Sequence, residues 1–186
     1  MKKSASIIFA VVLTVMLGTI VYSANISDDL FGAVEKNDMQ KVRYLIAIGA
    51  DVNVKDSYAS MSPLMMAAYD GYTEMAKLLI EKGAEVNAKG GADMDMTPLI
   101  FAASQDRTDM VKLLIEKGAN VNLKTQYGWT PLFFAVTRGR TDIVKLLIDM
   151  RAEGNVQLPT GETALSEAEK TGKSDIVKLL RQAGAK

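Results

Sequence analysis

A recurring segment of 33 to 35 residues constrains the fold of this chain more than any other feature of its sequence. The string KLLIEKGA appears at Lys77–Ala84 and again, unchanged, at Lys112–Ala119. When the related segments are aligned, one equivalent position is glycine in all but one of them. It is held by Gly49, Gly83, Gly118, Arg151 and Gly184. Such a period is typical of a solenoid, in which each repeat buries its apolar surface only against its neighbours.

Each repeat has the sequence of two short helices joined by a tight turn. Thr97-Pro98 suits the start of the first helix, because Thr can cap free N–H groups and Pro fits the first helical position. The second helix carries a buried leucine at an equivalent position in three repeats, namely Leu79, Leu114 and Leu147. A glycine such as Gly118 then fits the left-handed position that closes a helix. The repeats therefore predict a stack of helix pairs.

Four successive segments, beginning at Ser62, Thr97, Thr130 and Thr163, follow the pattern TPL–AA–G–IVKLLIxxGAxVN. This pattern resembles the ankyrin repeat, and the resemblance covers about residues 27–186. It implies an all-α solenoid of helix–turn–helix units with protruding β-turn fingers. The repeat domain would span residues 25–186, with units at approximately 27–56, 57–90, 91–124, 125–157 and 158–186.

Two departures from the ankyrin pattern occur near the C-terminus. Arg151 stands where the other units have glycine, so we expect a left-handed arginine, at a cost of about 1–2 kcal/mol. The fifth unit is strongly polar and carries Ser166, Glu167 and Lys170 on its first helix. This composition fits a terminal cap that faces water.

Composition argues against several functional classes. The chain has no cysteine and no histidine, so it lacks thiolate nucleophiles, the commonest general base and the commonest metal ligand. Lys+Arg and Asp+Glu both number 22, and a chain without net positive charge has little attraction for nucleic acid. Asp93-Met94-Asp95 lacks the six to eight oxygens of a calcium site. We expect no catalytic residue, metal, cofactor, nucleic acid or small-molecule substrate.

The first 24 residues have the layout of a secretory signal peptide. Lys2 and Lys3 precede an uncharged apolar run at residues 7–20, and the small residues Ser23 and Ala24 follow. We expect cleavage of residues 1–24 and export from a bacterial cytoplasm, to the periplasm or beyond the cell. The alternative is an uncleaved inner-membrane anchor at residues 7–22, which would tether a scaffold.

The resemblance also implies a protein partner, because ankyrin fingers and inner helices line a concave face that meets partners. Aromatic residues, methionine and arginine are enriched in binding hot spots. The chain has such residues at finger and inner-helix positions: Tyr58, Met61, Tyr69, Met96, Tyr127, Trp129 and Arg138. The alternative is that Trp129 and the methionines merely pack between fingers. We expect a monomer that binds a protein without catalysis.

Overall fold

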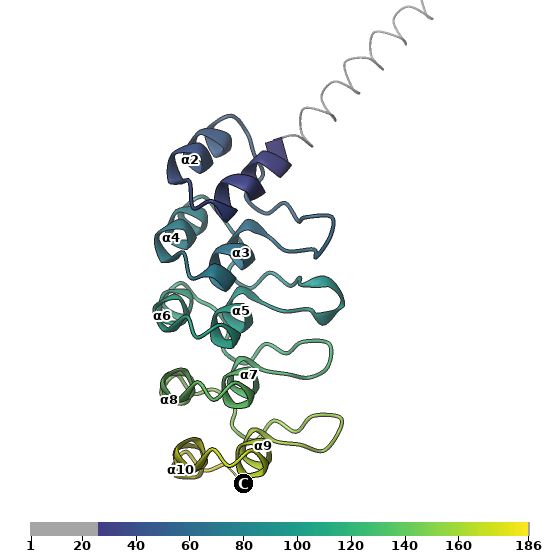
Figure 1. Cartoon of the computed structure of the whole chain (residues 1–186), viewed down its shortest axis with the longest axis vertical. Coiled ribbons are helices and arrows are strands. Elements are labelled where there is room, and N and C mark those ends of the chain that lie inside the picture. Colours follow the sequence, from purple (N-terminus) through teal and green to yellow (C-terminus); the bar gives the residue numbers. More distant parts are fainter. Residues whose placement is uncertain (1–25, 186) are drawn as a thin grey trace, which may run out of the picture.

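The computed structural model describes residues 26–185 and confirms the all-α solenoid, with its helix pairs stacked in chain order along the long axis (Figure 1). The inner layer consists of residues 26–35, α3 (Pro63–Asp70), α5 (Pro98–Ser104), α7 (Pro131–Thr137) and α9 (Ala164–Lys170). The outer layer consists of α2 (Met39–Ala47), α4 (Thr73–Glu81), α6 (Thr108–Glu116), α8 (Thr141–Asp149) and α10 (Ser174–Gln182). Loops protrude from the inner layer on one side, and one of them contains the short 3-10 helix η1 (Ala92–Met94).

The inner helices start as their sequences predict. The Thr97 hydroxyl accepts a hydrogen bond from the Ile100 N–H at 3.3 Å, and Pro98 occupies the first helical position. Thr130 caps α7 in the same way, through the Phe133 N–H at 3.2 Å. Every residue of α5 is buried, because this helix packs against α3, α6 and α7 at once. Alanines such as Ala102 allow these helices to approach one another closely.

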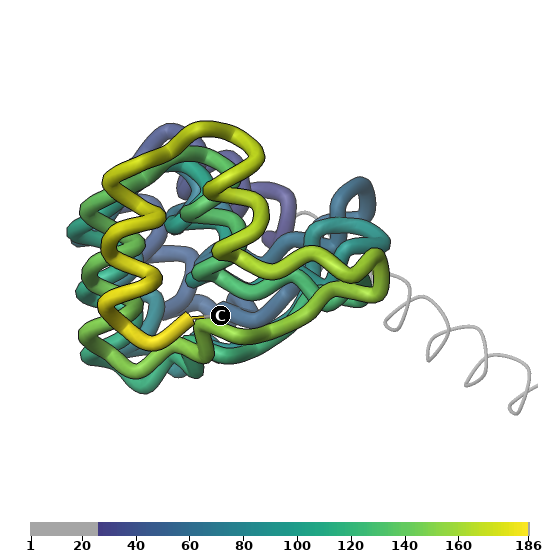
Figure 2. The backbone as a smooth tube through the Cα atoms, turned by 90° about the horizontal axis from the view of Figure 1, so that it is seen from below, coloured from purple at the N-terminus to yellow at the C-terminus, as the bar shows by residue number. Residues whose placement is uncertain are grey.

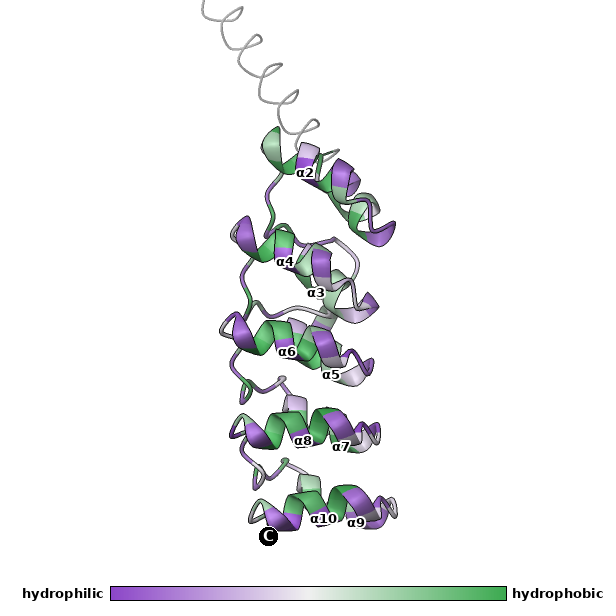
Figure 3. Ribbon diagram, turned by 90° about the vertical axis from the view of Figure 1, so that its left-hand side faces the viewer, coloured by the Kyte–Doolittle hydropathy of each residue, from purple (hydrophilic) through white to green (hydrophobic). Residues whose placement is uncertain are grey.

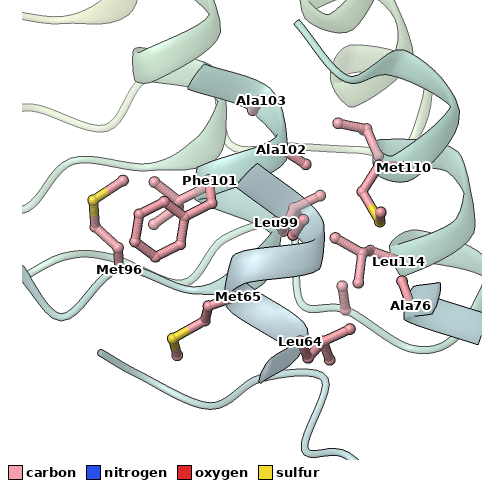
Figure 4. Packing of buried hydrophobic residues seen from close by; sticks show 14 of the residues in the cluster. Leu64, Met65, Ala76, Met96, Leu99, Phe101, Ala102, Ala103, Met110 and Leu114 are labelled. Carbon is pink, nitrogen blue, oxygen red and sulfur yellow. The ribbon is translucent and has the colours of Figure 1, made fainter. Parts of the chain in front are cut away.

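The outer helices are amphipathic, and hydrophobic and hydrophilic residues alternate along each of them (Figure 3), with residues such as Met75 and Ile143 buried. Leu79, Leu114 and Leu147 are fully buried, which confirms the predicted stripe. Figure 4 shows Leu114 and Met110 of α6 beside Leu99 of α5. Lys112 lies two residues from Leu114 and from Met110, on the opposite side of the helix, and is exposed.

The position that ends each outer helix is left-handed in every unit. Gly118 has a φ of 89° and Arg151 a φ of 61°, which confirms the expected left-handed arginine. The chain also turns through positive φ between the two helices of a unit, and Asn37 does so with a φ of 52°. Asparagine tolerates this conformation better than most residues.

Asparagine side chains join successive units beneath the outer helices. The Asn53 amide donates to the Gly83 carbonyl at 3.0 Å, while its carbonyl accepts from the Glu85 N–H at 2.8 Å. Asn87 bonds in the same way with the Gly118 carbonyl and the Asn120 N–H. These bonds hold the units in register, so that equivalent elements superpose along the stack (Figure 2).

Within residues 26–185, no helix has the length and apolarity needed to cross a membrane. The predicted signal peptide at residues 1–24, and the alternative anchor at residues 7–22, lie outside the described residues.

Candidate partner-binding face

The fingers are short hairpin loops, each closed at its base by a backbone hydrogen bond, which in the third finger is one of a reciprocal pair. We number them by the unit that they enter: the second finger is residues 56–61, the third 90–96, the fourth 125–129 and the fifth 158–162. The closing bonds run from Asp56 N–H to Met61 O, Gly90 N–H to Met96 O, Thr125 N–H to Trp129 O and Leu158 N–H to Glu162 O, at 2.8 to 2.9 Å. The fingers project from the inner helices on the side away from the outer helices (Figure 1). We call the surface that the fingers and inner helices form together the concave face.

Polar side chains hold the second and fourth fingers in shape. The Asp56 carboxylate accepts hydrogen bonds from the N–H groups of Tyr58, at 2.8 Å, and Met61, at 2.9 Å. In the fourth finger, the Thr125 hydroxyl accepts from the Trp129 N–H at 3.1 Å. These bonds fix the backbone of each turn and leave the side chains at its tip free to point outward.

Backbone hydrogen bonds also join neighbouring fingers. The Ala92 N–H of the third finger donates to the Ala59 carbonyl of the second. The Gln126 N–H of the fourth finger donates to the Met94 carbonyl of the third at 3.2 Å. We call residues 56–61, 90–96 and 125–129 together the finger platform. The fifth finger has Pro159 at the position of Gln126, and proline has no N–H to donate.

Three predicted site residues are exposed aromatics on this side of the molecule. Tyr58 at the tip of the second finger is 96% exposed, Tyr127 on the fourth is 53% exposed, and Tyr69 at the end of α3 is 44% exposed. The Tyr69 ring packs edge-on against Phe101, with centroids 6.2 Å apart. Arg138, also exposed, caps the C-terminus of α7. Tyr58 and Tyr127 are thus exposed on the fingers, whereas Tyr69 and Arg138 are exposed at the C-terminal ends of inner helices.

The predicted methionines and tryptophan face inward to different degrees. Met96 is only 8% exposed and lies beside Phe101 (Figure 4). Trp129 is half-buried, with its ring centroid 4.9 Å from that of Phe134 and 5.5 Å from that of Phe133. Met61 is half-buried and packs against the core. Packing between the fingers and the inner helices thus explains why Met96 is buried and why most of the Trp129 side chain is covered.

The sequence analysis did not identify Phe101 and Phe134 as site residues, although both help to shape this face. They hold equivalent positions on α5 and α7, and both are buried. With Met96 and Trp129 they fill the angle between the fingers and the inner helices in units three and four. Their shared position in the repeat, two residues after the Thr-Pro-Leu leucine, is the signal that could have identified them.

Charges lie along the C-terminal ends of the inner helices. Burial raises the pKa of Asp70, and the negative charge of Glu35 raises it further, although Arg107 acts in the opposite direction. The Arg107 guanidinium donates to the Tyr69 carbonyl at 3.2 Å, and the Lys173 ammonium donates to the Thr137 carbonyl at 3.0 Å. Cations at these helix ends interact favourably with the helix dipoles.

The outer face of the molecule has a different character. Lys77 pairs with Glu74 at 2.6 Å, and Lys112 pairs with Asp109 at 3.4 Å, each within its own helix. Across residues 26–185, no group of three or more acidic side chains is placed to hold a metal ion. The Asp93-Met94-Asp95 stretch forms the tip of the third finger and includes part of η1.

Comparison with known proteins identifies the repeat. A family model of ankyrin repeats in three copies matches residues 30–125 and 120–186. Among curated proteins, the potassium channel KOR1 of rice (Oryza sativa subsp. japonica) is 42% identical over 64 residues. That match covers 34% of this chain and 7% of the channel, so the chain spans a small fraction of the channel's length. The family model covers most of the chain, which therefore belongs to the ankyrin repeat family, whose repeats form protein–protein interaction modules.

Proposed function

We propose that this chain binds a protein partner, without catalysis, through the concave face formed by its fingers and inner helices. The observation that carries the proposal is the exposure of Tyr58 and Tyr127 on the fingers, and of Tyr69 at the end of α3, in an ankyrin solenoid. Tyrosine offers a large apolar ring and a hydrogen-bonding hydroxyl, which is why it is enriched in interfaces. The proposed contact set also includes Met61, Met96, Trp129 and Arg138, with Met96 contributing only its small exposed part.

The outer face is a weaker candidate for partner binding. Its exposed lysines alternate with acids, and pairs such as Lys112–Asp109 are satisfied within one helix. Exposed pairs of this kind contribute little energy, and binding there would have to displace them. The tyrosines of the concave face carry no such competing charge.

We also propose that the chain acts as a monomer in the bacterial envelope, in the periplasm or after secretion. The Lys2-Lys3 start, the apolar run and the small residues at Ser23-Ala24 support this location. The alternative is a scaffold that residues 7–22 tether to the inner membrane. Mass spectrometry of the protein from its source cells separates the two. A mature start at Ala24 or Asn25 is expected, and an intact Met1 in the membrane fraction would favour the anchor.

The test of the binding face compares two matched double variants. Tyr69→Ala with Arg138→Ala alters the concave face, and Lys112→Ala with Lys145→Ala alters the outer face at exposed positions. Each is used to capture proteins from an extract of the source cells, with quantitative mass spectrometry against the parent. We expect the concave variant to lose the partner and the outer variant to retain it. The reverse pattern would place the partner on the outer helices.

A further inference from the structure

We propose that Met94 is a site of reversible oxidation by hydrogen peroxide, and that conversion of its thioether to the sulfoxide opens the third finger and separates the finger platform. The tip of the third finger is here residues 92–95. This chemistry takes place at one side chain of the protein itself, so it is independent of any partner and can be tested without one.

Sulfur occurs in this chain only as methionine, because the sequence has no cysteine. Seven of the 11 methionines fall between residues 61 and 110, in units two and three. The fold protects them to different degrees: Met65, Met75 and Met110 are at most 1% exposed, whereas Met94 is half-buried. Oxidation requires contact between the oxidant and the sulfur, so peroxide should reach Met94 and spare the three buried thioethers.

The Met94 side chain connects the tip of the third finger to the body of the protein. Its neighbours Ala92, Asp93 and Asp95 are exposed, but Met94 packs against the hydrophobic core. The tip also carries an ion pair between Asp95 and Lys89 at 3.5 Å, in which both side chains are about half exposed. Exposed ion pairs contribute little free energy. Burial of Met94 is therefore the main side-chain contact that keeps the tip closed.

The closed tip has a strained backbone. Ala92 and Asp95 have φ values of 53° and 56°, in the left-handed region that residues other than glycine disfavour. The shorter fourth finger turns through positive φ at Gly128, where a glycine bears no such cost. Strain of this kind persists only where surrounding contacts hold it. Loss of the Met94 contact would therefore favour an open tip.

Opening of the tip would disconnect the third finger from both of its neighbours. The Met94 carbonyl accepts a hydrogen bond from the Gln126 N–H of the fourth finger at 3.2 Å. The Ala92 N–H donates to the Ala59 carbonyl of the second finger. Both bonds arise from the tip that Met94 holds in place, so a change at this one side chain affects the whole finger platform.

Oxidation removes the property of Met94 that keeps the tip closed. The sulfur lone pair attacks one oxygen of hydrogen peroxide, an S–O bond forms and the O–O bond breaks. The new sulfur-bound hydroxyl gives its proton to the departing hydroxide, which becomes water, so sulfur loses the two electrons that the peroxide gains. The sulfoxide is polar, and burying a polar group without a hydrogen-bond partner costs free energy. The oxidised side chain therefore favours the solvated, open tip.

The reaction is reversible. Methionine sulfoxide reductase returns the sulfoxide to the thioether, and two thiols supply the electrons and end as a disulfide, with release of water. The restored thioether can pack against the core again, so the third finger should close and rejoin its neighbours.

Treatment of the full chain with hydrogen peroxide, followed by two measurements, tests the proposal. Peptide mass spectrometry gives the fraction of sulfoxide at each methionine, and native-state hydrogen exchange gives the opening of the Gln126 amide. Met150 is the matched control site, because it is 46% exposed but ends α8 in the outer layer. The amides of α7 report whether the rest of the solenoid stays folded.

Three variants assign the effect to one side chain. Met94→Leu keeps an apolar side chain that peroxide does not oxidise, and Met94→Gln places a polar group at the same position without oxidant. Met150→Leu removes the control site alone.

We expect sulfoxide at Met94 well before Met110. Exchange at Gln126 should become at least about tenfold faster, because an unpaired buried polar group shifts an opening equilibrium by such a factor. The α7 amides should keep their protection, and methionine sulfoxide reductase should restore slow exchange at Gln126. Met94→Leu should abolish the response to peroxide, Met94→Gln should show fast exchange without it, and Met150→Leu should respond as the parent does.

Several outcomes would overturn the proposal. Sulfoxide at Met94 no earlier than at Met110 would show that the closed tip shields this sulfur. Sulfoxide at Met94 with unchanged exchange at Gln126, or a full response in Met94→Leu, would show that Met94 does not hold the finger. Loss of protection in α7 together with Gln126 would mean that oxidation unfolds the whole solenoid. The capture experiment on the concave face is unaffected by each of these results.

Discussion

The junction between units three and four and the junction between units four and five join the same kinds of elements by different means. At the first, the Gln126 N–H bonds to the Met94 carbonyl and links two fingers. At the second, Pro159 offers no N–H, and the described residues include no backbone hydrogen bond between the fourth and fifth fingers. The finger platform therefore ends at unit four.

The loop that follows α8 is irregular as well. Arg151 holds a left-handed conformation that glycine holds in the other units. Gly154 stands where the earlier units have Val52, Val86 and Val121. The second junction thus lacks the bond between fingers and lies beside a left-handed arginine.

Burial follows the same trend. All seven residues of α5 are buried, but only three of the seven in α9. In a solenoid, each unit is stabilised by its own contacts and by its interfaces with neighbours. Unit five has neighbours on one side within the described chain and a weakened interface there, so it should open locally before the platform does.

The largest expected effect comes from removing core volume beside the strong junction. Leu114→Ala should lower the free energy of unfolding by about 2–5 kcal/mol, because a fully buried leucine leaves a cavity. Chemical denaturation measures this loss. Lys112→Ala, on the exposed face of the same helix, is the control and should stay within about 0.5 kcal/mol. Equal losses for the two would mean that the helix faces are assigned wrongly.

The next effect separates the two aromatic residues of the fourth finger. Trp129→Ala should cost about 1–3 kcal/mol, less than for a fully buried tryptophan, because Trp129 is only partly buried against the rings of Phe133 and Phe134. Tyr127→Ala should cost less than about 0.5 kcal/mol, as for a surface residue. If Tyr127→Ala destabilises as much as Trp129→Ala, Tyr127 belongs to the core and is no partner contact.

Repairing the weak junction should have a smaller effect of opposite sign. Arg151→Gly should stabilise the protein by roughly 0.5–1 kcal/mol, since relief of a strained left-handed residue is partly offset by glycine's entropy in the unfolded chain. Thermal melts of the two proteins measure the gain. An unchanged or lowered melting temperature would show that Arg151 does not strain the junction.

The smallest effect concerns pH at Asp70, which lies at the end of α3 in unit two. The pKa of Asp70 lies above its ordinary value of 3.8, so the folded state keeps this proton at higher pH than the unfolded state does. The contribution of Asp70 to the free energy of unfolding therefore falls as pH rises from the unfolded-state pKa to the higher folded-state pKa. It stays low at higher pH. Asp70→Asn should raise the melting temperature relative to the parent at pH 7 but not at pH 3. Asp149→Asn, an exposed control, should show no such difference.

Aligning the repeats predicted the features that residues at equivalent positions share in every unit. Leu114 and Arg151 could be assigned correctly because a shared position implies a shared backbone conformation and a shared face. The packing of Met96 and Trp129 could not be predicted, because residue type does not show which side of a finger faces the helix, and the third finger is two residues longer than the fourth. The bond from Gln126 to Met94 depends on how the fingers stack.

Residue-level hydrogen exchange in the native protein tests most directly whether fingers two to four form one platform that ends at unit four. The informative amides are those of Ala92 and Gln126, which bond across fingers, and that of Thr160 on the fifth finger. We predict slow exchange at Ala92 and Gln126, with protection close to that of α5 and α7, and faster exchange at Thr160 and throughout α9 and α10. Exchange at Ala92 and Gln126 as fast as at Thr160, or uniform protection across all units, would contradict the account.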